Sequence, residues 1–291
     1  MEPGVTTARL SKFIAVPAVS LPRYAQPMTA RTKIAVIGGS GLYSLFDDPE
    51  TLEVATPYGT ATVSLGQVGG TDVAFLPRHG AGHSVSPHLI NYRANIWALA
   101  SLGVKAIVSS AAVGGVSPDY PAGTLVLTDQ YIDRTSGRAD TFYDRGSVQH
   151  LPSADPFCPA LHEAAVRALG DSAAPSGTVV VIQGPRFSTR AESEWFRAAG
   201  AHTVNMTLYP EVPLASELNI GTINLSFVTD ADAAPADQAV SAELVFARFA
   251  EAQPRIIAAI HLLVAAIPDD YEGRELMDPA EVAAVLARPA E

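Results

Sequence analysis

The sequence predicts a single α/β domain, a twisted, mixed and largely parallel β-sheet flanked by α-helices. Short apolar runs alternate with amphipathic segments from about residue 33 to residue 267, with no change in composition to mark a domain boundary. Hydrophobic residues form 48% of the 291 residues, enough for one large buried core. We expect the domain to span residues 31–268, between a loosely ordered extension (1–30) and a peripheral C-terminal tail (269–291).

The N-terminal extension contains an apolar run, Phe13–Leu21, that resembles the core of a secretory signal peptide. Pro17 and Pro22 interrupt this run, and no small-x-small cleavage site precedes a mature start. We therefore expect an extension that stays loosely ordered, with a signal peptide as the alternative.

The net charge and the cysteine content limit the partners that the protein can bind and the cellular compartment in which it can act. The net charge of −11 argues against a nucleic-acid or anionic-membrane surface, because both need clustered Lys and Arg. Cys158 is the single cysteine, which excludes an internal disulfide and a Cys-based zinc site and fits a reducing compartment. We expect a cytoplasmic protein with a small-molecule partner, no nucleic acid and no membrane.

The first strand is expected at Ile34–Ile37, where it runs into a glycine-rich turn, Gly38–Gly41. Backbone N–H groups in such a turn can close on an anion, and Ser40 adds a hydroxyl. The pattern lacks the Lys of a P-loop and the third glycine of G-x-G-x-x-G. A tight turn that binds nothing is an equally good interpretation of this segment alone.

Two alternating runs within Val54–Leu76 flank a Gly-Gly pair and predict an antiparallel hairpin. The second run ends at Arg78 and His79, which can supply charged donors to a phosphate; a surface arginine and a loop histidine are the alternative. Together with His83 and His88, His79 could suggest a metal site. Their spacing is not helical and no carboxylate or Cys accompanies them, so we expect no metal.

The middle of the chain predicts a helix at Asn91–Leu102, ended by Gly103, and then a buried strand at Ala106–Ser109. This strand opens into S-S-A-A-V-G-G-V, a second glycine-rich exit. Two such exits can converge on one anion from two sides. A further apolar strand is expected within Gly123–Asp129.

A helix is expected at Ala160–Leu169 and a strand at Thr178–Gln183. Ser188 or Thr189 can cap the helix that follows this strand. Phe187 lies on the connecting loop, where it can stack on a planar base or simply pack in the core.

Polar side chains follow the last two apolar runs of the predicted sheet. Thr207 and Glu211 come after one run, and Asp230 and Asp232 after the other. Ligands of α/β proteins bind beyond the carboxyl ends of parallel strands, so these residues are site candidates. Two solvated loop aspartates are the alternative for the second pair.

The last helix is expected at Ala239–Ile267, bent or broken at Pro254. Its most apolar part, Ile256–Ile267, is shorter than the ~18 uninterrupted apolar residues of a membrane span and reads as a buried helix.

Eight motifs, in this order, resemble the trimeric purine nucleoside phosphorylase and S-methyl-5′-thioadenosine phosphorylase family, over about residues 33–265. They are G-G-S-G-L from Gly38, P-R-H-G from Pro77, N-Y-R-A-N-I-W-A-L from Asn91, S-A-A-V-G-G-V from Ser110, D-Q-Y-I-D-R-T from Asp129, P-F-C-P from Pro156, G-P-R-F-S-T-R-A-E from Gly184 and N-M-T-x-x-P-E from Asn205. The resemblance implies a nucleoside phosphorylase-like fold and phosphorolysis, in which inorganic phosphate attacks C1′ of a purine nucleoside.

The resemblance also implies two groups of binding residues. Phosphate would be bound by Ser40, Arg78, His79, the Ala111 amide and Thr207. The nucleoside would contact Ala112, Val113, Gly114, Phe187, Ser188, Val204, Asn205, Met206, His150, Ala242 and Val245. No cofactor and no metal are expected, since phosphate is a co-substrate.

Asp230 is the implied general acid, which would protonate N7 of the leaving purine, with Asp232 beside it to raise its pKa. A carboxylate here accepts from a 6-amino group, whereas an Asn would suit 6-oxopurines, so T-D-A-D at Thr229–Asp232 resembles the adenine-specific pattern. The predicted reaction converts S-methyl-5′-thioadenosine and phosphate into adenine and 5-methylthioribose 1-phosphate. The alternatives are a 6-oxopurine nucleoside phosphorylase and a catalytically silent nucleoside-binding protein.

Two departures from the family pattern bear on the substrate. Ala233–Pro235 stand where the methylthioadenosine branch has bulkier residues, and Ala111 replaces a threonine of the phosphate loop. The 5′ pocket, expected from Ala242, Val245 and His150, is mixed in polarity and permits methylthioadenosine or adenosine. His150 matches a family position that reaches across the interface, so the resemblance implies a homotrimer with shared sites, acting in purine and methionine salvage.

Overall fold

A computed structural model describes Met1 and residues 32–47, 49–232 and 241–290. Its strands form one sheet in the order β2-β3-β4-β1-β5-β9-β8-β7, with β10 paired to β5 and β6 paired to β10. The strands are β1 (Ile34–Gly38), β2 (Glu50–Thr56), β3 (Gly59–Val68), β4 (Thr71–Pro77), β5 (Ala106–Gly115), β6 (Leu125–Thr128), β7 (Gln130–Arg134), β8 (Thr178–Ile182), β9 (Thr203–Asn205) and β10 (Gly221–Ala231). Among these strands five pairings are parallel and four antiparallel, which confirms the expected mixed sheet.

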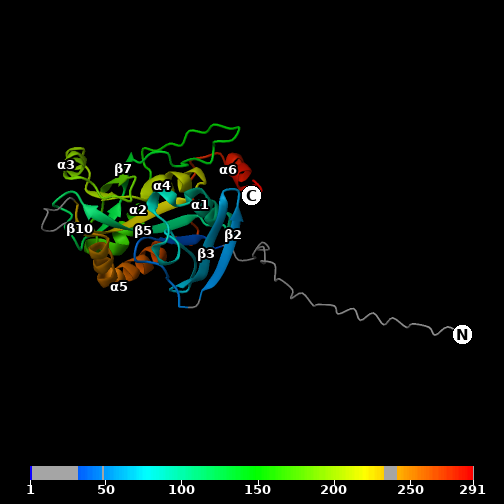
Figure 1. Ribbon diagram of the computed structural model, residues 1–291, viewed down its shortest axis with the longest axis horizontal. Coiled ribbons are helices and arrows are strands. Elements are labelled where there is room, and N and C mark those ends of the chain that lie inside the picture. Colours follow the sequence, from blue (N-terminus) through cyan, green and yellow to red (C-terminus); the bar gives the residue numbers. More distant parts are fainter. Residues whose placement is uncertain (2–31, 48, 233–240, 291) are drawn as a thin grey trace.

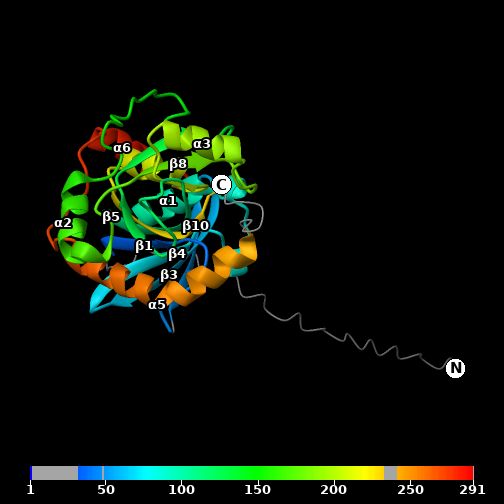
Figure 2. The same ribbon diagram turned by 90° about the vertical axis from the view of Figure 1, so that its left-hand side faces the viewer.

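Helices cover both faces of this sheet (Figures 1 and 2). They are α1 (Tyr92–Ser101), α2 (Pro159–Leu169), α3 (Arg190–Ala198), α4 (Leu208–Glu217), α5 (Ala242–Ala266) and α6 (Pro279–Leu286), with short 3-10 turns at Ala81–His83, Pro87–Leu89 and Gly170–Ser172. The two largest apolar cores lie on opposite faces of the sheet, one beneath α2 and α5 and the other beneath α1, α4 and α6. Strands covered on both faces are buried along nearly their whole length, as β1 and β10 are.

Local signals in the sequence account for several element boundaries. The hairpin of β3 and β4 turns at Gly69 and Gly70, both of which have positive φ, as predicted. Asn91 caps α1 through its side chain, and Thr189 and Glu192 form a reciprocal capping box on α3. β5 is longer than the predicted Ala106–Ser109, because its second half pairs with β10.

Helix α5 differs from its prediction in two respects. It runs through Pro254 without a break, and Pro254 is exposed, so the missing N–H bond faces water. Among the described residues, α5 is one helix that is long and apolar enough to cross a membrane, judged by length and composition only. Buried core helices of soluble proteins meet the same criterion. Its apolar face packs in the core through Phe249, Ile256, Ala259, Ile260, Leu263 and Val264.

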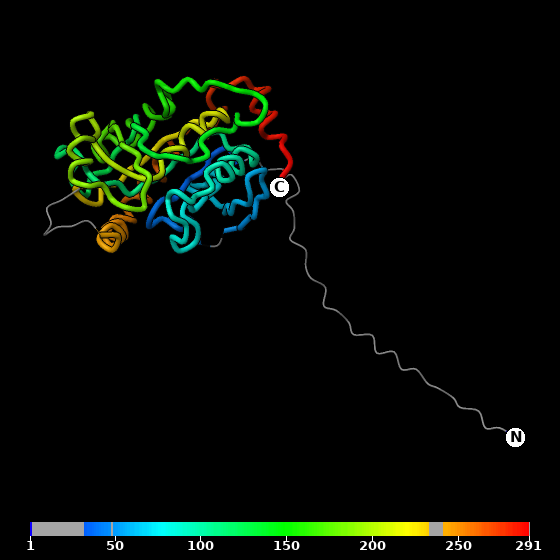
Figure 3. The backbone as a smooth tube through the Cα atoms, turned by 45° about the horizontal axis from the view of Figure 1, so that its top comes forward, coloured from blue at the N-terminus to red at the C-terminus, as the bar shows by residue number. Residues whose placement is uncertain are grey.

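The C-terminal segment is more than the peripheral tail that we expected. Figure 3 shows its helix α6, in red, lying beside the long green loop that precedes α2. Val285 of α6 is buried, and its carbonyl accepts a hydrogen bond from the Trp97 indole at 3.1 Å. Arg288 donates to the carbonyl of Phe142 at 2.8 Å. The sequence did not predict this docking, because the apolar residues of the C-terminal segment are interspersed with charged residues.

Three sequence predictions lie outside the described residues. They are the loosely ordered extension 1–30, apart from Met1, the departure at Ala233–Pro235, and the first residues of the helix expected from Ala239.

Replacing Phe249 by alanine should lower the free energy of unfolding by about 3–5 kcal/mol, because the ring is fully buried between α5 and the sheet, edge-on to Phe227. Urea unfolding measures the change. On the same helix Leu262 is 51% exposed, and Leu262→Ala should shift the free energy by no more than about 0.5 kcal/mol. Similar losses for both variants would contradict the packing of α5 described above.

Candidate active site

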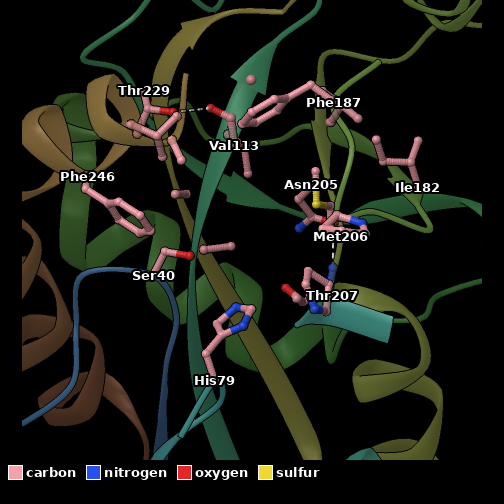
Figure 4. A pocket seen from close by; sticks show the side chains of 18 of the residues that line it. Ser40, His79, Val113, Ile182, Phe187, Asn205, Met206, Thr207, Thr229 and Phe246 are labelled. Atoms are coloured by element: carbon pink, nitrogen blue, oxygen red, sulfur yellow. Dashed lines mark hydrogen bonds between the residues drawn. The ribbon is translucent and has the colours of Figure 1, made fainter. Parts of the chain in front are cut away.

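A cavity of about 340 Å³ lies where the ends of six strands meet loop residues and the start of α5. Figure 4 shows Ser40 and His79 on one side of it, Asn205, Met206 and Thr207 on another, and Thr229 and Phe246 near the remaining wall. The sheet order brings together the exits of β1, β4, β5 and β10, which run parallel. Carboxyl ends of parallel strands are the usual place for a ligand site in an α/β protein.

The turn after β1 approaches the middle of β5 so closely that only glycine fits. A Cβ on Gly39 would lie 2.5 Å from the Ser110 carbonyl oxygen and 2.9 Å from Nη1 of Arg78. The Gly39 amide instead donates to the Ser110 hydroxyl at 3.2 Å. This contact joins the two glycine-rich exits and places Ser40 and Ala111 in the wall of one cavity.

Arg78 is buried and paired with Glu211 of α4. Its Nε and Nη2 donate to the two Glu211 carboxylate oxygens at 2.5 and 2.8 Å, and its Nη1 donates to the Ser110 carbonyl at 2.8 Å. Burial alone would lower the pKa of Arg78, but the charge and hydrogen bonds of Glu211 outweigh burial and raise it. The positive charge of Arg78, which we expected to act on a phosphate ligand, is therefore balanced by Glu211 inside the protein.

His79 is also different from the charged donor that we expected. Its Nδ1 lies 2.9 Å from the Val85 carbonyl oxygen. Burial lowers the pKa of His79 to about 4, and the Arg78 and His83 charges act in the same direction. The ring is therefore neutral at pH 7. His83, which follows on the same loop, packs its ring against His79 with centroids 4.2 Å apart.

At the opposite end, β10 delivers two aspartates side by side. The register with β5 is irregular between Val228 and Asp230, and such a bulge re-aims the side chains that follow it. Gly114 leaves room for both carboxylates, because a Cβ there would lie 3.1 Å from Cβ of Asp232 and 3.4 Å from Oδ1 of Asp230. Asp230 and Asp232 both line the cavity, at 5% and 8% exposure.

The Asp230 carboxyl has its pKa raised. Burial is the main cause, and the neighbouring Asp232 adds to it, while a hydrogen bond from the Thr229 hydroxyl to Oδ2, at 2.6 Å, opposes the shift. Pairing with Asp232 was the expected cause of the raised pKa, but burial contributes more. A carboxyl held in this way keeps its proton at higher pH than a solvent-exposed aspartate does, as a general acid requires.

The wall between these two ends is mostly apolar. Phe187 is 40% exposed on the loop after β8, and the buried Ser188 hydroxyl has no hydrogen-bond partner within the described residues. Arg138 holds this wall from behind, since its Nη2 donates to the carbonyls of Gln183 and Met206 at 2.9 and 3.0 Å. The backbone on both sides of the wall is thus fixed by one guanidinium.

The start of α5 forms an apolar flank of the cavity. Ala242, Val245 and Phe246 line it there, and the Phe246 ring meets His83 edge-on with centroids 5.1 Å apart. Ser241 caps the helix by accepting from the Leu244 amide at 3.2 Å. The cap fixes where the helix begins and hence which side chains face the cavity.

Of the residues predicted for the site, the structure brings all but two into the wall of this cavity, and one of the two, Glu211, is held against Arg78 instead. His150 is exposed on the loop before α2 and does not line it. The cavity also contains residues that sequence reasoning did not assign to the site: His83, Val85, Ser86, Pro87, Ile182, Pro185, Thr229 and Phe246. His83 and Phe246 had signals in the sequence, a histidine four residues after His79 and an aromatic residue next to Val245. Within the part of the chain that the structure describes, no three or more His, Cys, Asp or Glu residues gather as a metal site.

Comparisons with known proteins place this geometry in a family. Residues 33–266 match the Phosphorylase superfamily. An S-methyl-5′-thioadenosine phosphorylase of Mycobacterium tuberculosis is 51% identical over 222 residues, 75% of this chain and 83% of that protein. A purine nucleoside phosphorylase of Streptomyces coelicolor is 46% identical over 256 residues, 83% of this chain and 91% of that protein.

Solved structures agree with the sequence relatives. A methylthioadenosine phosphorylase from an antarctic soil metagenomic library is 36% identical with a TM-score of 0.79, over 89% of this chain and 100% of that one. The Schistosoma mansoni enzyme, solved in complex with adenine, is 32% identical with a TM-score of 0.78, over 88% and 96% of the two chains. Both the sequence matches and the fold extend over nearly the whole α/β domain. The chain therefore belongs to the phosphorylase superfamily.

Proposed function

We propose that the protein is a phosphorylase of S-methyl-5′-thioadenosine, which it converts with inorganic phosphate into adenine and 5-methylthioribose 1-phosphate. The observation that carries this proposal is the buried Asp230, which shares one cavity with the paired Arg78 and with the apolar start of α5. Several relatives that are 42–51% identical are named for this activity.

The Arg78 end of the cavity suits the phosphate. Ser40, Thr207 and the Ala111 amide supply neutral donors, and the remaining N–H groups of Arg78 add charge-assisted ones. Because Glu211 balances the arginine, phosphate would be oriented there without losing its nucleophilicity to a strong net positive charge. Attack on C1′ then requires the ribose to lie between this end and Asp230, over Met206.

The Asp230 end suits the purine base. A purine departs poorly as an anion, so a protonated Asp230 would donate to N7 as the C1′–N9 bond breaks. The pKa of Asp230 is raised by burial, which keeps the carboxyl protonated further toward neutral pH. Asp232 would accept from the 6-amino group, and Phe187 would stack on the base.

The flank formed by α5 supports a methylthio group at the 5′ position. Ala242, Val245 and Phe246 offer apolar surface, and the neighbouring His83 has its pKa lowered by burial, which favours the neutral ring. A 5′ hydroxyl there would lose hydrogen bonds to water. This favours methylthioadenosine over adenosine, and the part of the 5′ pocket that one chain supplies is less mixed than the sequence predicted, since His150 lies outside the cavity of its own chain.

The second candidate is a 6-oxopurine nucleoside phosphorylase, acting on 5′-methylthioinosine, inosine or guanosine. The Streptomyces coelicolor relative named as a purine nucleoside phosphorylase supports it. Two adjacent acidic side chains at the base end argue against it, because the one proton on Asp230 would be used at N7 and an ionised Asp232 cannot donate to O6. A catalytically silent nucleoside-binding protein is disfavoured by a general-acid candidate with a raised pKa in the same cavity.

We further propose a cytoplasmic homotrimer that needs no cofactor. His150 lies exposed outside its own cavity, which supports a role in the site of a neighbouring subunit. The net charge of −11 and the single cysteine favour a cytoplasmic location.

A substrate panel tests the proposed function. Adenine should be released from S-methyl-5′-thioadenosine only when phosphate is present, and more slowly from adenosine, because the 5′ pocket is apolar. Liquid chromatography of the released base, with and without phosphate, measures this. Hypoxanthine as the only product, from inosine or methylthioinosine, would overturn the adenine assignment. Tight binding of methylthioadenosine without turnover at saturating phosphate would favour the silent binder.

Replacing Asp230 by asparagine should lower kcat/KM for methylthioadenosine by about 10²–10⁴-fold, because an amide cannot supply the proton for N7. Activity on methylthioinosine should be spared or rise. The new amide oxygen can still accept from the Thr229 hydroxyl, which turns the NH₂ group toward the base. The matched control is Asp270→Asn, at an exposed site outside the cavity. An equal loss on both substrates would contradict the selectivity argument.

Replacing Phe246 by alanine should lower the ratio of kcat/KM for methylthioadenosine over adenosine by about tenfold, since the 5′ pocket loses apolar surface. The kinetic constants for both nucleosides at saturating phosphate provide the measurement. Leu262→Ala, at an exposed site on the same helix, should leave the ratio unchanged. An unchanged ratio in Phe246→Ala would place the 5′ group elsewhere.

A further inference from the structure

The hydrogen bond between His79 and Val85 determines which nitrogen of the His79 ring carries hydrogen. A backbone carbonyl can only accept, so Nδ1, 2.9 Å from the Val85 carbonyl oxygen, must be the donor. Because burial lowers the pKa of His79 to about 4, the ring carries one hydrogen at neutral pH. Nε2 is then left with a lone pair.

The Nε2 edge of the ring faces the phosphate end of the cavity. His79 lines the cavity, with its ring directed toward the space between Ser40 and Thr207 (Figure 4). Its Nδ1 is used by Val85 and one ring face is covered by His83. Within the described residues no hydrogen-bond donor reaches Nε2. An oxyanion in this corner therefore meets an acceptor, and not a donor, at this position.

The charges around His79 reinforce the same preference. Arg78 is the one Lys or Arg among the described residues that line the cavity, and Glu211 balances it through two hydrogen bonds. The charged and titratable groups around His79 are Arg78 and His83 on its own loop and Glu211 of α4, which lies behind Arg78. Across the cavity lie Asp230 of β10 and Asp232, just after that strand. No net positive charge compensates for a lone pair that points at a bare oxyanion.

We propose that Nε2 of His79 accepts a hydrogen bond from a hydroxyl of the bound anion, so that the site selects an oxyanion that retains a proton. Inorganic phosphate and arsenate retain at least one proton at neutral pH, whereas sulfate retains none. The anion would be oriented with its protonated oxygen toward His79, which leaves unprotonated oxygens toward the ribose. This inference rests on the proposed use of phosphate as co-substrate.

Binding to the wild-type protein provides the first test. At pH 7.5 arsenate should bind about as tightly as phosphate, and sulfate should bind at least about tenfold more weakly than phosphate. Sulfate has no hydroxyl to donate to Nε2 of His79, so the hydrogen bond is lost and a buried acceptor faces an unprotonated oxygen. Isothermal titration calorimetry with each anion alone measures the three affinities. Sulfate binding as tightly as phosphate overturns the inference and leaves the proposed function intact. Absence of phosphate binding would instead count against the proposed function.

The pH dependence of sulfate binding provides the second test. As pH falls toward 4, His79 gains a proton at Nε2 and becomes a donor, so sulfate affinity should rise several-fold between pH 6 and pH 4, with most of the rise below pH 5. Circular dichroism at each pH confirms that the protein stays folded over the range compared. Sulfate affinity that does not change over the folded range contradicts the inference.

A variant separates His79 from the other titrating groups. His79→Gln can present an NH₂ donor at the position of Nε2, so the preference for phosphate over sulfate should fall by about tenfold. The matched control, His261→Gln, changes an exposed residue of α5 outside the cavity and should keep the wild-type preference. An unchanged preference in a folded His79→Gln protein overturns the assignment. If this variant fails to fold, the anion series and pH series on the wild type decide the question.

Discussion

The buried ion pair of Arg78 and Glu211 is the contact on which the site depends. Arg78 follows β4 and Glu211 lies on α4, after β9, so the pair spans the two strands, β1 and β5, that separate β4 from β9 in the sheet. The third donor of Arg78 reaches Ser110 of β5 between them. Removing either partner of such a pair leaves a buried charge that typically costs about 3–5 kcal/mol. The pair thus holds three separate segments of the phosphate end in one arrangement.

The two ends of the cavity differ in their electrostatics. At one end the only buried cation is already balanced and the histidine beside it is neutral, within the residues described. At the other end a carboxyl is pushed toward its protonated form by burial and by a neighbouring acid. Burial is the first cause of the pKa shift of both His79 and Asp230. The sheet and α5, which exclude water from the cavity, therefore shift both side chains toward their neutral forms.

Much of the fold could be predicted because local signals reported it. The β3–β4 hairpin, the cap at Asn91 and the capping box at Thr189 all follow from residues close together in the chain. Features that depend on distant partners could not be predicted. The length of β5 is set by pairing with β10, and α6 is docked by a hydrogen bond to Trp97, 188 residues away.

The sequence alone determined which chemical groups the site has: a serine in a glycine turn, an arginine–histidine pair, a threonine and two aspartates, each placed after an apolar run. The tertiary structure decided the state of each group. Glu211 was only a polar residue in the sequence until packing put it on Arg78, and His79 became a neutral acceptor only through burial and the Val85 carbonyl. Charge balance and pKa depend on what surrounds a group in space, and residues from distant parts of the chain provide those surroundings.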